Sequence, residues 1–199
     1  MAIAGLLLAA GSSRRFGGAK LLAPLPDGTP VGVRSARTLA GAVERALAVV
    51  RPDDTVLASL LAEQGLEVRA FAGAAEGMGA SLAFGVAAAP EADGWLVALA
   101  DMPWVRAETV RAVADLLRDG ALIAAPCRSG RRGHPVGFGC SLISELMGLR
   151  GDRGAREILS RHADRITLLE VDDDGILLDI DELIDLPQSM TRMTKNFSL

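Results

Sequence analysis

The fold is decided by residues 6–20, which read LLLAAGSSRRFGGAK. An apolar run that is typical of a buried strand stops at small residues, and two arginines and a lysine follow within one loop. Small residues let backbone N–H groups approach a ligand closely, and the cations supply charge for phosphate oxygens. Open α/β sheets bind ligands at the carboxyl ends of their strands. The stretch therefore predicts a loop for a nucleoside triphosphate, although it lacks the glycine, lysine and hydroxyl spacing of a Walker loop.

The composition narrows the class of protein. Of the 199 residues, 50% are hydrophobic and 4% are aromatic, and the net charge is −4. A nucleic-acid surface combines exposed aromatic residues with a basic patch, so this composition argues against one. Two cysteines are too few for a disulfide framework. Since no apolar stretch reaches the ~20 residues that span a bilayer, we expect a cytoplasmic protein that binds neither nucleic acid nor membrane.

Strand and helix signals alternate along the chain, which indicates a mostly parallel sheet with helices on both faces. Strands are predicted at 3–9, 55–60, 67–71, 94–100, 121–125, 165–171 and 175–180. Helices are predicted at 31–50, 78–89, 105–118, 141–147 and 154–162, and residues 127–139 are predicted to cross the active-site face as a loop or ribbon. We expect residues 1–190 to form a single domain and residues 191–199 a loose C-terminal tail.

Asp101 is the second anchor for function. It ends the apolar run 95–100 and comes just before Pro103, which stops the strand there. A carboxylate in this position faces the ligand crevice of the sheet. Mg²⁺ usually takes one or two carboxylates together with substrate phosphates, so Asp101 is a candidate metal ligand. The alternative is an N-cap for the helix that follows.

More carboxylates lie near the end of the chain. Asp179 and Asp181 occupy alternate positions of a predicted strand, and alternate residues of a strand point the same way. This spacing makes a metal site there possible. The neighbouring run 172–175, Asp-Asp-Asp-Gly, is interpreted as a solvated turn, because adjacent carboxylates point apart and the glycine suits a hairpin.

Two glycine-containing segments could contact substrate. Residues 77–82 read GMGASL at a predicted helix start, where Gly79 permits close approach and the helix N-terminus favours anions. An ordinary glycine-rich helix entry would look the same. Residues 130–136 read GRRGHPV, and Arg132 beside His134 suggests contact with an acidic substrate, with a solvated basic turn as the alternative.

A third glycine-containing segment, residues 151–156, reads GDRGAR. Asp152 can cap the helix that follows, which would explain it without any role in function. Arg156 could instead reach a phosphate. The sequence leaves both interpretations open.

Taken in this order, the motifs resemble the MobA-like nucleotidyltransferases, and within them the molybdenum cofactor cytidylyltransferases, over residues 3–187. The opening pattern LAAG-x-S-x-R-x-G-x-x-K runs from Leu8 to Lys20, with Phe16 where methionine is usual. Its Ala-Ala-Gly form is similar to that of the cytidine-using members. The blocks at 77–82, 101–103, 132–136 and 151–156 are similar to the same branch, whereas residues 179–185 read DIDELID where DIDTPED is usual.

The resemblance implies a Rossmann-like, glycosyltransferase-A-like α/β domain. It also implies a reaction in which CTP and the phosphate of molybdenum-bound molybdopterin give a cytidine dinucleotide cofactor and pyrophosphate, with Mg²⁺ or Mn²⁺ present. A recipient molybdoenzyme or chaperone is the implied partner.

Residue roles follow from the motifs and the resemblance together. The expected catalytic residues are Arg15, Lys20 and Asp101, and the expected metal ligands are Asp101 and Asp179. The nucleotide is expected to contact Leu8, Ala9, Ala10, Gly11, Ser12, Ser13, Arg15, Lys20, Gly79, Ser81 and Asp101. The acceptor is expected to contact Arg132, His134 and Arg156.

Other functions are compatible with the same residues. A nucleotidyltransferase that uses CTP or GTP with another phosphorylated small molecule needs the same loop and metal. A nucleotide-binding or cofactor-carrying module without turnover would retain them as well. An NAD-binding Rossmann protein is disfavoured, because residues 11–17 contain no G-x-G-x-x-G and no ribose-binding acid follows at the expected distance.

Overall fold

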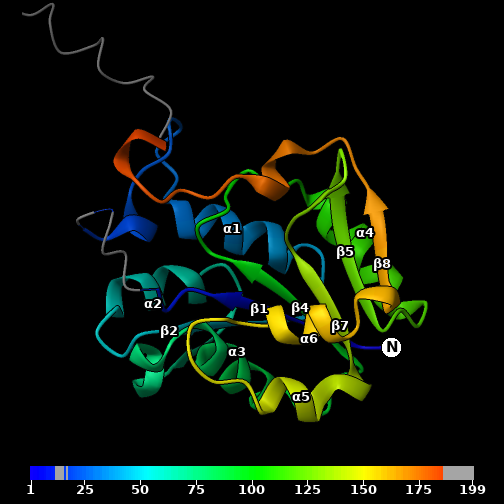
Figure 1. The fold of residues 1–199 in the computed structure, drawn as a ribbon. Helices are drawn as coiled ribbons and strands as arrows, with labels where there is room; N and C mark the ends of the chain where they lie inside the picture. Colours follow the sequence, from blue (N-terminus) through cyan, green and yellow to red (C-terminus); the bar gives the residue numbers. More distant parts are fainter. Residues whose placement is uncertain (12–15, 17, 186–199) are drawn as a thin grey trace, which may run out of the picture.

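The structure is a computed structural model that describes residues 1–11, 16 and 18–185. Its centre is an eight-stranded sheet in the order β3-β2-β1-β4-β7-β5-β6, with β8 also paired to β5 (Figure 1). The strands are β1 (Ile3–Leu8), β2 (Arg45–Val50), β3 (Glu67–Ala70), β4 (Gly94–Leu99), β5 (Ile123–Arg128), β6 (Arg131–Arg132), β7 (Val136–Gly139) and β8 (Ile166–Glu170).

Most neighbouring strands run parallel. β1 pairs in parallel with β2 and with β4, β2 with β3, and β5 with β8. β7 is antiparallel to both β4 and β5, and the short β6 is antiparallel to β5. The predicted single-domain α/β fold with a mostly parallel sheet is therefore confirmed. The 127–139 segment, predicted as a loop or ribbon, instead supplies β6 and the internal strand β7.

Helices cover both faces of the sheet, as predicted (Figure 1). They are α1 (Val31–Ala40), α2 (Thr55–Ala62), α3 (Met78–Ala87), α4 (Ala107–Arg118), α5 (Ile143–Met147) and α6 (Arg156–Arg161). Neighbouring residues of β1 point to opposite faces. Leu7 packs with Leu39 of α1 and Val113 of α4, whereas Leu6 packs with Leu82 of α3 and Leu146 of α5. The sheet thus separates two apolar cores.

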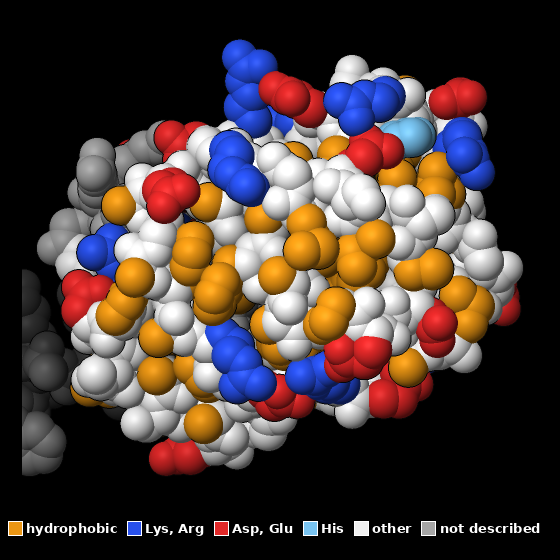
Figure 2. All heavy atoms as spheres, turned by 90° about the horizontal axis from the view of Figure 1, so that it is seen from below, with side chains coloured by type: hydrophobic (Ala, Val, Ile, Leu, Met, Phe, Trp, Pro, Cys, Tyr) orange, Lys and Arg blue, Asp and Glu red, His pale blue; other side chains and the backbone are white. Residues whose placement is uncertain are grey.

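The outer surface of the α3–α5 layer carries apolar side chains. Figure 2 shows them spread across the middle of this face, with most charged side chains toward its rim. Met78 and Met147 are 46% and 43% exposed there. Exposed apolar residues are ordinary on a protein surface, and this layer buries its other side against the sheet.

Two sequence predictions on the chain's first third were wrong. The helix expected over 31–50 ends at Ala40, and 45–50 form β2. β2 lies between β1 and β3, and five of its six residues are buried. Its side chains are therefore apolar on both faces of the sheet, and such a continuous apolar run also fits the pattern of a buried helix. The strand expected at 55–60 is the helix α2, in which Leu57 and Leu61 are buried at the helical spacing of four residues.

The prediction of a strand at 175–180 was also wrong. Residues 174–177 form a short 3-10 helix, and the segment after it lies across the sheet's edge. The 172–175 run is a solvated turn only in part. Asp172 and Asp174 are exposed, but Asp173 is 2% exposed. The expected tail 191–199 lies outside the described residues. No helix in the described part of the chain is long and apolar enough to cross a membrane.

The carboxyl ends of β1, β2 and β4 meet at one edge of the sheet. The amide of Ala9 donates to the carbonyl of Val49 at 2.9 Å, and the amide of Ala100 donates to the carbonyl of Leu8 at 3.1 Å. Strand pairing thus continues past the regular strands. Ser35 of α1 donates its hydroxyl to the carbonyl of Ala100 at 3.0 Å, which holds the residue just before Asp101.

Candidate functional site

A partly buried ion pair joins the two anchors that the sequence singles out, Lys20 and Asp101. Lys20 begins a short 3-10 helix, η1 (Lys20–Leu22), and its side chain is 10% exposed. Its Nζ donates to Oδ2 of Asp101 at 2.7 Å and lies 3.5 Å from Oδ1 of Asp181. A buried ammonium group is stable only when it is paired. The phosphate-loop lysine and the strand-end carboxylate therefore lie at one point of the fold.

Three carboxylates gather at this point. Asp101, Asp179 and Asp181 each offer an oxygen, and these oxygens lie within 4.8 Å of one another. The placement comes from Ile180, which is fully buried and whose amide donates to the carbonyl of Asp101 at 2.9 Å. The two aspartates that flank Ile180 are thereby held beside Asp101, although this segment is not a strand.

Asp185 shapes the turn that follows these aspartates. Its Oδ2 accepts hydrogen bonds from the amides of Asp181 and Glu182 at 2.8 and 2.7 Å. These backbone hydrogen bonds lower the pKa of Asp185, because they stabilise its ionised form. A carboxylate thus closes the turn where the Thr-Pro pair of the family pattern is missing.

The carboxylate group fits a divalent cation. Carboxylate oxygens are the ligands that Mg²⁺ and Mn²⁺ prefer, and three anionic side chains this close together repel one another without a cation between them. Lys20 supplies that positive charge here. Asp101 and Asp179, predicted as metal ligands, are therefore close together, and Asp181 joins them.

A cleft of about 610 Å³ opens beside this cluster. Its walls come from the end of β1, the start of α3 and the segment before it, and it is lined by Leu8, Ala9, Ala10, Gly11, Lys20, Leu21, Arg51, Ala74, Ala75, Gly77, Met78, Ser81, Leu99, Asp101 and Asp152. An ideal Cβ on Gly11 would meet no atom of the described residues within 4 Å, so among these residues its backbone is open to a ligand. Of the predicted nucleotide contacts, Leu8, Ala9, Ala10, Gly11, Lys20, Ser81 and Asp101 line this cleft.

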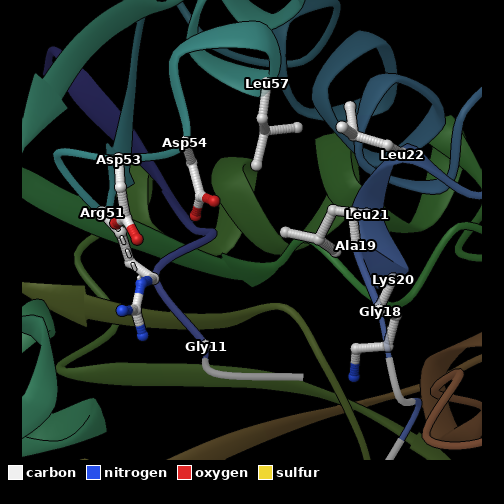
Figure 3. A pocket seen from close by; sticks show the side chains of 10 residues that line it. All are labelled: Gly11, Gly18, Ala19, Lys20, Leu21, Leu22, Arg51, Asp53, Asp54 and Leu57. Atoms are coloured by element: carbon white, nitrogen blue, oxygen red, sulfur yellow. Dashed lines mark hydrogen bonds and ion pairs between the residues drawn. The ribbon is translucent and has the colours of Figure 1, made fainter. Parts of the chain in front are cut away.

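A second hollow of about 360 Å³ adjoins the first and shares Gly11, Lys20, Leu21 and Arg51 with it. Figure 3 shows the Arg51 and Lys20 side chains reaching toward the space above Gly11 from different sides. Nε of Arg51 lies 3.2 Å from Oδ1 of Asp53, and this hydrogen bond lowers the pKa of Asp53. Two cations, Lys20 and Arg51, therefore border both hollows.

Arg51 is a candidate functional residue that the sequence prediction missed. It directly follows β2, so it lies at the same edge of the sheet as Asp101. The signal was a charged residue directly after a buried apolar run, and the same pattern, with a carboxylate, singled out Asp101. This signal was not recognised because residues 31–50 were predicted to form one helix, so no strand was expected to end just before Arg51.

Two of the predicted nucleotide contacts, Gly79 and Ser81, are held by hydrogen bonds near the start of α3, and only Ser81 of the two lines the cleft. Gly79 packs against the 150–152 loop: its amide donates to the carbonyl of Gly151 at 2.7 Å, and an ideal Cβ would lie 2.8 Å from the carbonyl oxygen of Arg150. Ser81 is buried, and its hydroxyl donates to the carbonyl of Gly77 at 3.2 Å. Ser12, Ser13 and Arg15 lie outside the described residues.

Asp152 does not cap a helix. α6 begins at Arg156 after Ala155, which is its N-cap, and no side chain caps it. Asp152 instead lines the cleft beside Gly77, whose φ of 112° and lack of a Cβ allow the two segments to touch. It is a second cleft residue that the sequence left without a functional role.

The predicted acceptor residues lie apart from the main cleft. Arg132 on β6 and Arg156 at the start of α6 are both exposed, and neither is among the described residues that line the cleft. His134 borders a cavity of about 20 Å³ that is lined by residues of α1, β4 and α4. Its Nδ1 is buried without a hydrogen-bond partner among the described atoms. Burial lowers the pKa of His134, the charge of Asp101 opposes this shift, and Arg132 adds to it.

Comparison with known proteins agrees with this geometry. Residues 5–166 match the model of the MobA-like NTP transferase domain. The chain belongs to this family. The purine catabolism protein PucB of Bacillus subtilis (strain 168) is 31% identical over 188 residues, covering 89% of this chain and 90% of that protein. The nicotine blue oxidoreductase of Paenarthrobacter nicotinovorans is 28% identical over 187 residues, covering 90% and 92%.

A solved structure shares the fold of this MobA-like chain. Rv0371c from Mycobacterium tuberculosis H37Rv superposes with a TM-score of 0.80 at 28% identity, covering 92% of this chain and 95% of that one. A complex of Rv0371c with manganese superposes with a TM-score of 0.77 at 26% identity, covering 93% and 96%. The nucleotidyltransferase fold is thus established, and a divalent cation binds a similar protein.

The position of Lys20 leads to a prediction about metal binding. Lys20→Met removes the cation that is paired with Asp101 and Asp181, so Mn²⁺ should bind the nucleotide-free variant roughly tenfold more tightly than the wild type. Free Mn²⁺ is measured by electron paramagnetic resonance. Arg51→Met is the control, because Arg51 pairs with Asp53, and it should change the affinity much less. Weaker Mn²⁺ binding by a folded Lys20→Met protein would contradict this competition.

His134 leads to a prediction about pH. Because its pKa is lowered in the fold, the unfolded chain binds its proton first, and stability present above about pH 6.5 is lost as the pH falls toward the folded pKa. His134→Asn should flatten the fall in unfolding free energy between about pH 6.5 and 5, by up to about 1.4 kcal/mol per pH unit. Urea titrations at each pH measure this. An unchanged slope in His134→Asn would refute the assignment.

Proposed function

We propose that this protein transfers CMP from CTP to the phosphate of molybdopterin, in its molybdenum-bound form, and releases pyrophosphate. The observation that carries the proposal is the meeting of Lys20 with a carboxylate group at the end of a cleft walled by the Ala9–Gly11 segment. The family supports a nucleotidyltransferase. The Ala-Ala-Gly form of the loop and the motif blocks of the cytidine-using branch support CTP and the pterin.

The reaction balances without a catalytic base. An oxygen of the acceptor's phosphate attacks the α-phosphorus of CTP, the bond from that phosphorus to the oxygen bridging to the β-phosphorus breaks, and pyrophosphate leaves. A phosphate monoester is already anionic near neutral pH, so no proton has to be removed from it. The protein must therefore supply alignment of the two phosphates and neutralisation of the charge on them.

The residues of the cleft can meet both needs. Lys20 Nζ can move from Asp101 to the triphosphate by rotation of a flexible side chain, and Arg51 offers a second cation on the far side of Gly11. The backbone of Ala10 and Gly11 and the Ser81 region would hold the nucleoside. Arg15, together with Ser12 and Ser13, keeps its proposed role in binding phosphates.

The acceptor side of the proposal rests on Arg132, His134 and Arg156. The two exposed arginines can pair with the phosphate of an arriving pterin. His134 is half-buried and its pKa is influenced by the charge of Asp101, so it would act on the acceptor side of the carboxylates. A recipient molybdoenzyme or chaperone would take the product.

A divalent cation, Mg²⁺ or Mn²⁺, would be held by Asp101 and Asp179, with Asp181 beside them. When bound, such an ion neutralises charge on the phosphate oxygens. The closeness of the three carboxylates and the manganese complex of Rv0371c support this assignment. Lys20 would then be freed from the carboxylates and be available to the nucleotide.

The direct test is pyrophosphate release with CTP, GTP, ATP or UTP and Mg²⁺, each with and without molybdenum-loaded molybdopterin. We expect release only with CTP and the pterin, because the loop has the cytidine-type form. Preference for GTP would assign the protein to guanylyl transfer. Nucleotide binding without release under any pairing would contradict the proposal and favour another acceptor or a module without turnover.

Lys20 should be essential for turnover. Lys20→Ala removes the cation that would neutralise the leaving pyrophosphate, and we expect at least a roughly 10²-fold loss in the rate of pyrophosphate release. Arg118→Ala is the control: Arg118 ends α4 and pairs with Glu44 and Asp115, so it should retain the rate. A folded Lys20→Ala protein with near-wild-type turnover would remove Lys20 from the mechanism.

A further inference from the structure

Residues 171–181, here called the strap, bring the last two carboxylates to the site. The strap leaves β8, where the amide of Val171 donates to the carbonyl of Cys127 at 2.9 Å. It then crosses the edge of the sheet, in orange in Figure 1, and reaches the end of β4, where Ile180 bonds to Asp101. The positions of Asp179 and Asp181 therefore depend on how the strap is held along its length.

Asp173 is a buried carboxylate of the strap with three hydrogen bonds. It is 2% exposed, and both of its oxygens accept hydrogen bonds. Oδ2 accepts from the amide of Arg106 at 2.9 Å and from the hydroxyl of Thr109 at 2.7 Å, and Oδ1 accepts from the amide of Gly175 at 3.0 Å. The carboxylate thus joins the strap to α4 and, at the same time, fixes the turn of the strap.

The helix needs this carboxylate. α4 has Arg106 as its N-cap, and the side chain of Arg106 makes no capping hydrogen bond. The first amides of a helix are otherwise unpaired, and the positive end of the helix dipole favours an anion. Asp173 supplies both a hydrogen-bond acceptor and a negative charge, although it lies 67 residues from Arg106 along the chain.

The strap beyond Asp173 is packed closely against the sheet's edge. An ideal Cβ on Gly175 would collide with the carbonyl of Trp104, so only glycine allows this approach. The carbonyl of Ile176 accepts a hydrogen bond from the amide of His134 at 3.0 Å, and its side chain is fully buried. Because the strap is packed closely between Asp173 and Ile180, a displacement of Asp173 should also displace Ile180.

We propose that Asp173 is a positioning residue that holds the strap on α4 and thereby keeps Asp179 and Asp181 beside Asp101. It does not line the cleft among the described residues, and it acts through the backbone of the strap. The inference rests on the proposed function in one respect, that these carboxylates bind the metal. Partners outside a metal's ligands typically change its affinity by about 10- to 100-fold when they are removed.

The chain supplies matched controls. Asp172 and Asp174 flank Asp173, but both are exposed and pair with Arg128, at 2.6 and 3.0 Å. Asp172→Asn therefore makes the same kind of change in the same run without touching α4. Thr109→Val removes only one of the three hydrogen bonds of Asp173 and keeps the shape of the side chain.

The experiment measures Mn²⁺ affinity by electron paramagnetic resonance, thermal unfolding, and hydrogen exchange of the Ile180 amide, in the full-length protein. We expect Asp173→Ala to bind Mn²⁺ about tenfold more weakly and to exchange the Ile180 amide faster. Asp173→Asn should restore part of the affinity, since its amide oxygen can still accept from Arg106. Thr109→Val should lie between the wild type and Asp173→Ala, and Asp172→Asn should match the wild type.

A folded Asp173→Ala protein with wild-type Mn²⁺ affinity and wild-type Ile180 exchange would overturn the proposal. If Asp173→Ala does not fold, Thr109→Val decides, and wild-type values for it overturn the proposal. If the wild type binds no Mn²⁺, the proposed metal site fails, but faster Ile180 exchange in Asp173→Ala would still show that Asp173 holds the strap.

Discussion

The rest of the site depends on the burial of one ammonium group. Lys20 has a side chain that is 10% exposed, and a charge in that environment must be compensated within a few ångströms. The compensation comes from Asp101 at the end of β4 and from Asp181 beyond the last strand. These ion pairs bring Lys20, the end of β4 and the last part of the described chain to one place. The cleft lies beside this point because Ala9 to Gly11 carry almost no side chain there.

Much of the fold could be predicted because its signals are local. β1 and β4 are apolar runs stopped by small residues or by proline, and the amphipathic spacing of α4 is regular. Asp101 and Lys20 were identified as functional because each follows or closes such a signal at a strand end. Their direct contact could not be predicted, since 81 residues separate them and only the parallel pairing of β1 with β4 places them together.

The parts that could not be predicted depend on partners distant in the sequence. β2 is buried on both faces between two other strands, so its pattern cannot be told from that of a buried helix. Because the end of β2 was not predicted, Arg51 was not identified as a candidate functional residue. Asp173 was interpreted as part of a solvated turn because adjacent carboxylates point apart and a glycine follows, whereas two of its hydrogen bonds are to the start of α4, which lies elsewhere in the chain. Asp179 and Asp181 were grouped correctly, but Ile180 and the carbonyl of Asp101 are what hold them.

The order of the segments has a consequence for how the protein is made. All eight strands are complete at Glu170, whereas two of the three clustered carboxylates come after it. During synthesis all the described strands are therefore made before the last two carboxylates, and the contact that closes the site spans 161 residues. A product cut short within the strap would keep every strand and lack Asp179 and Asp181. If these carboxylates bind a divalent cation as proposed, such a product would lack the site while keeping the sheet.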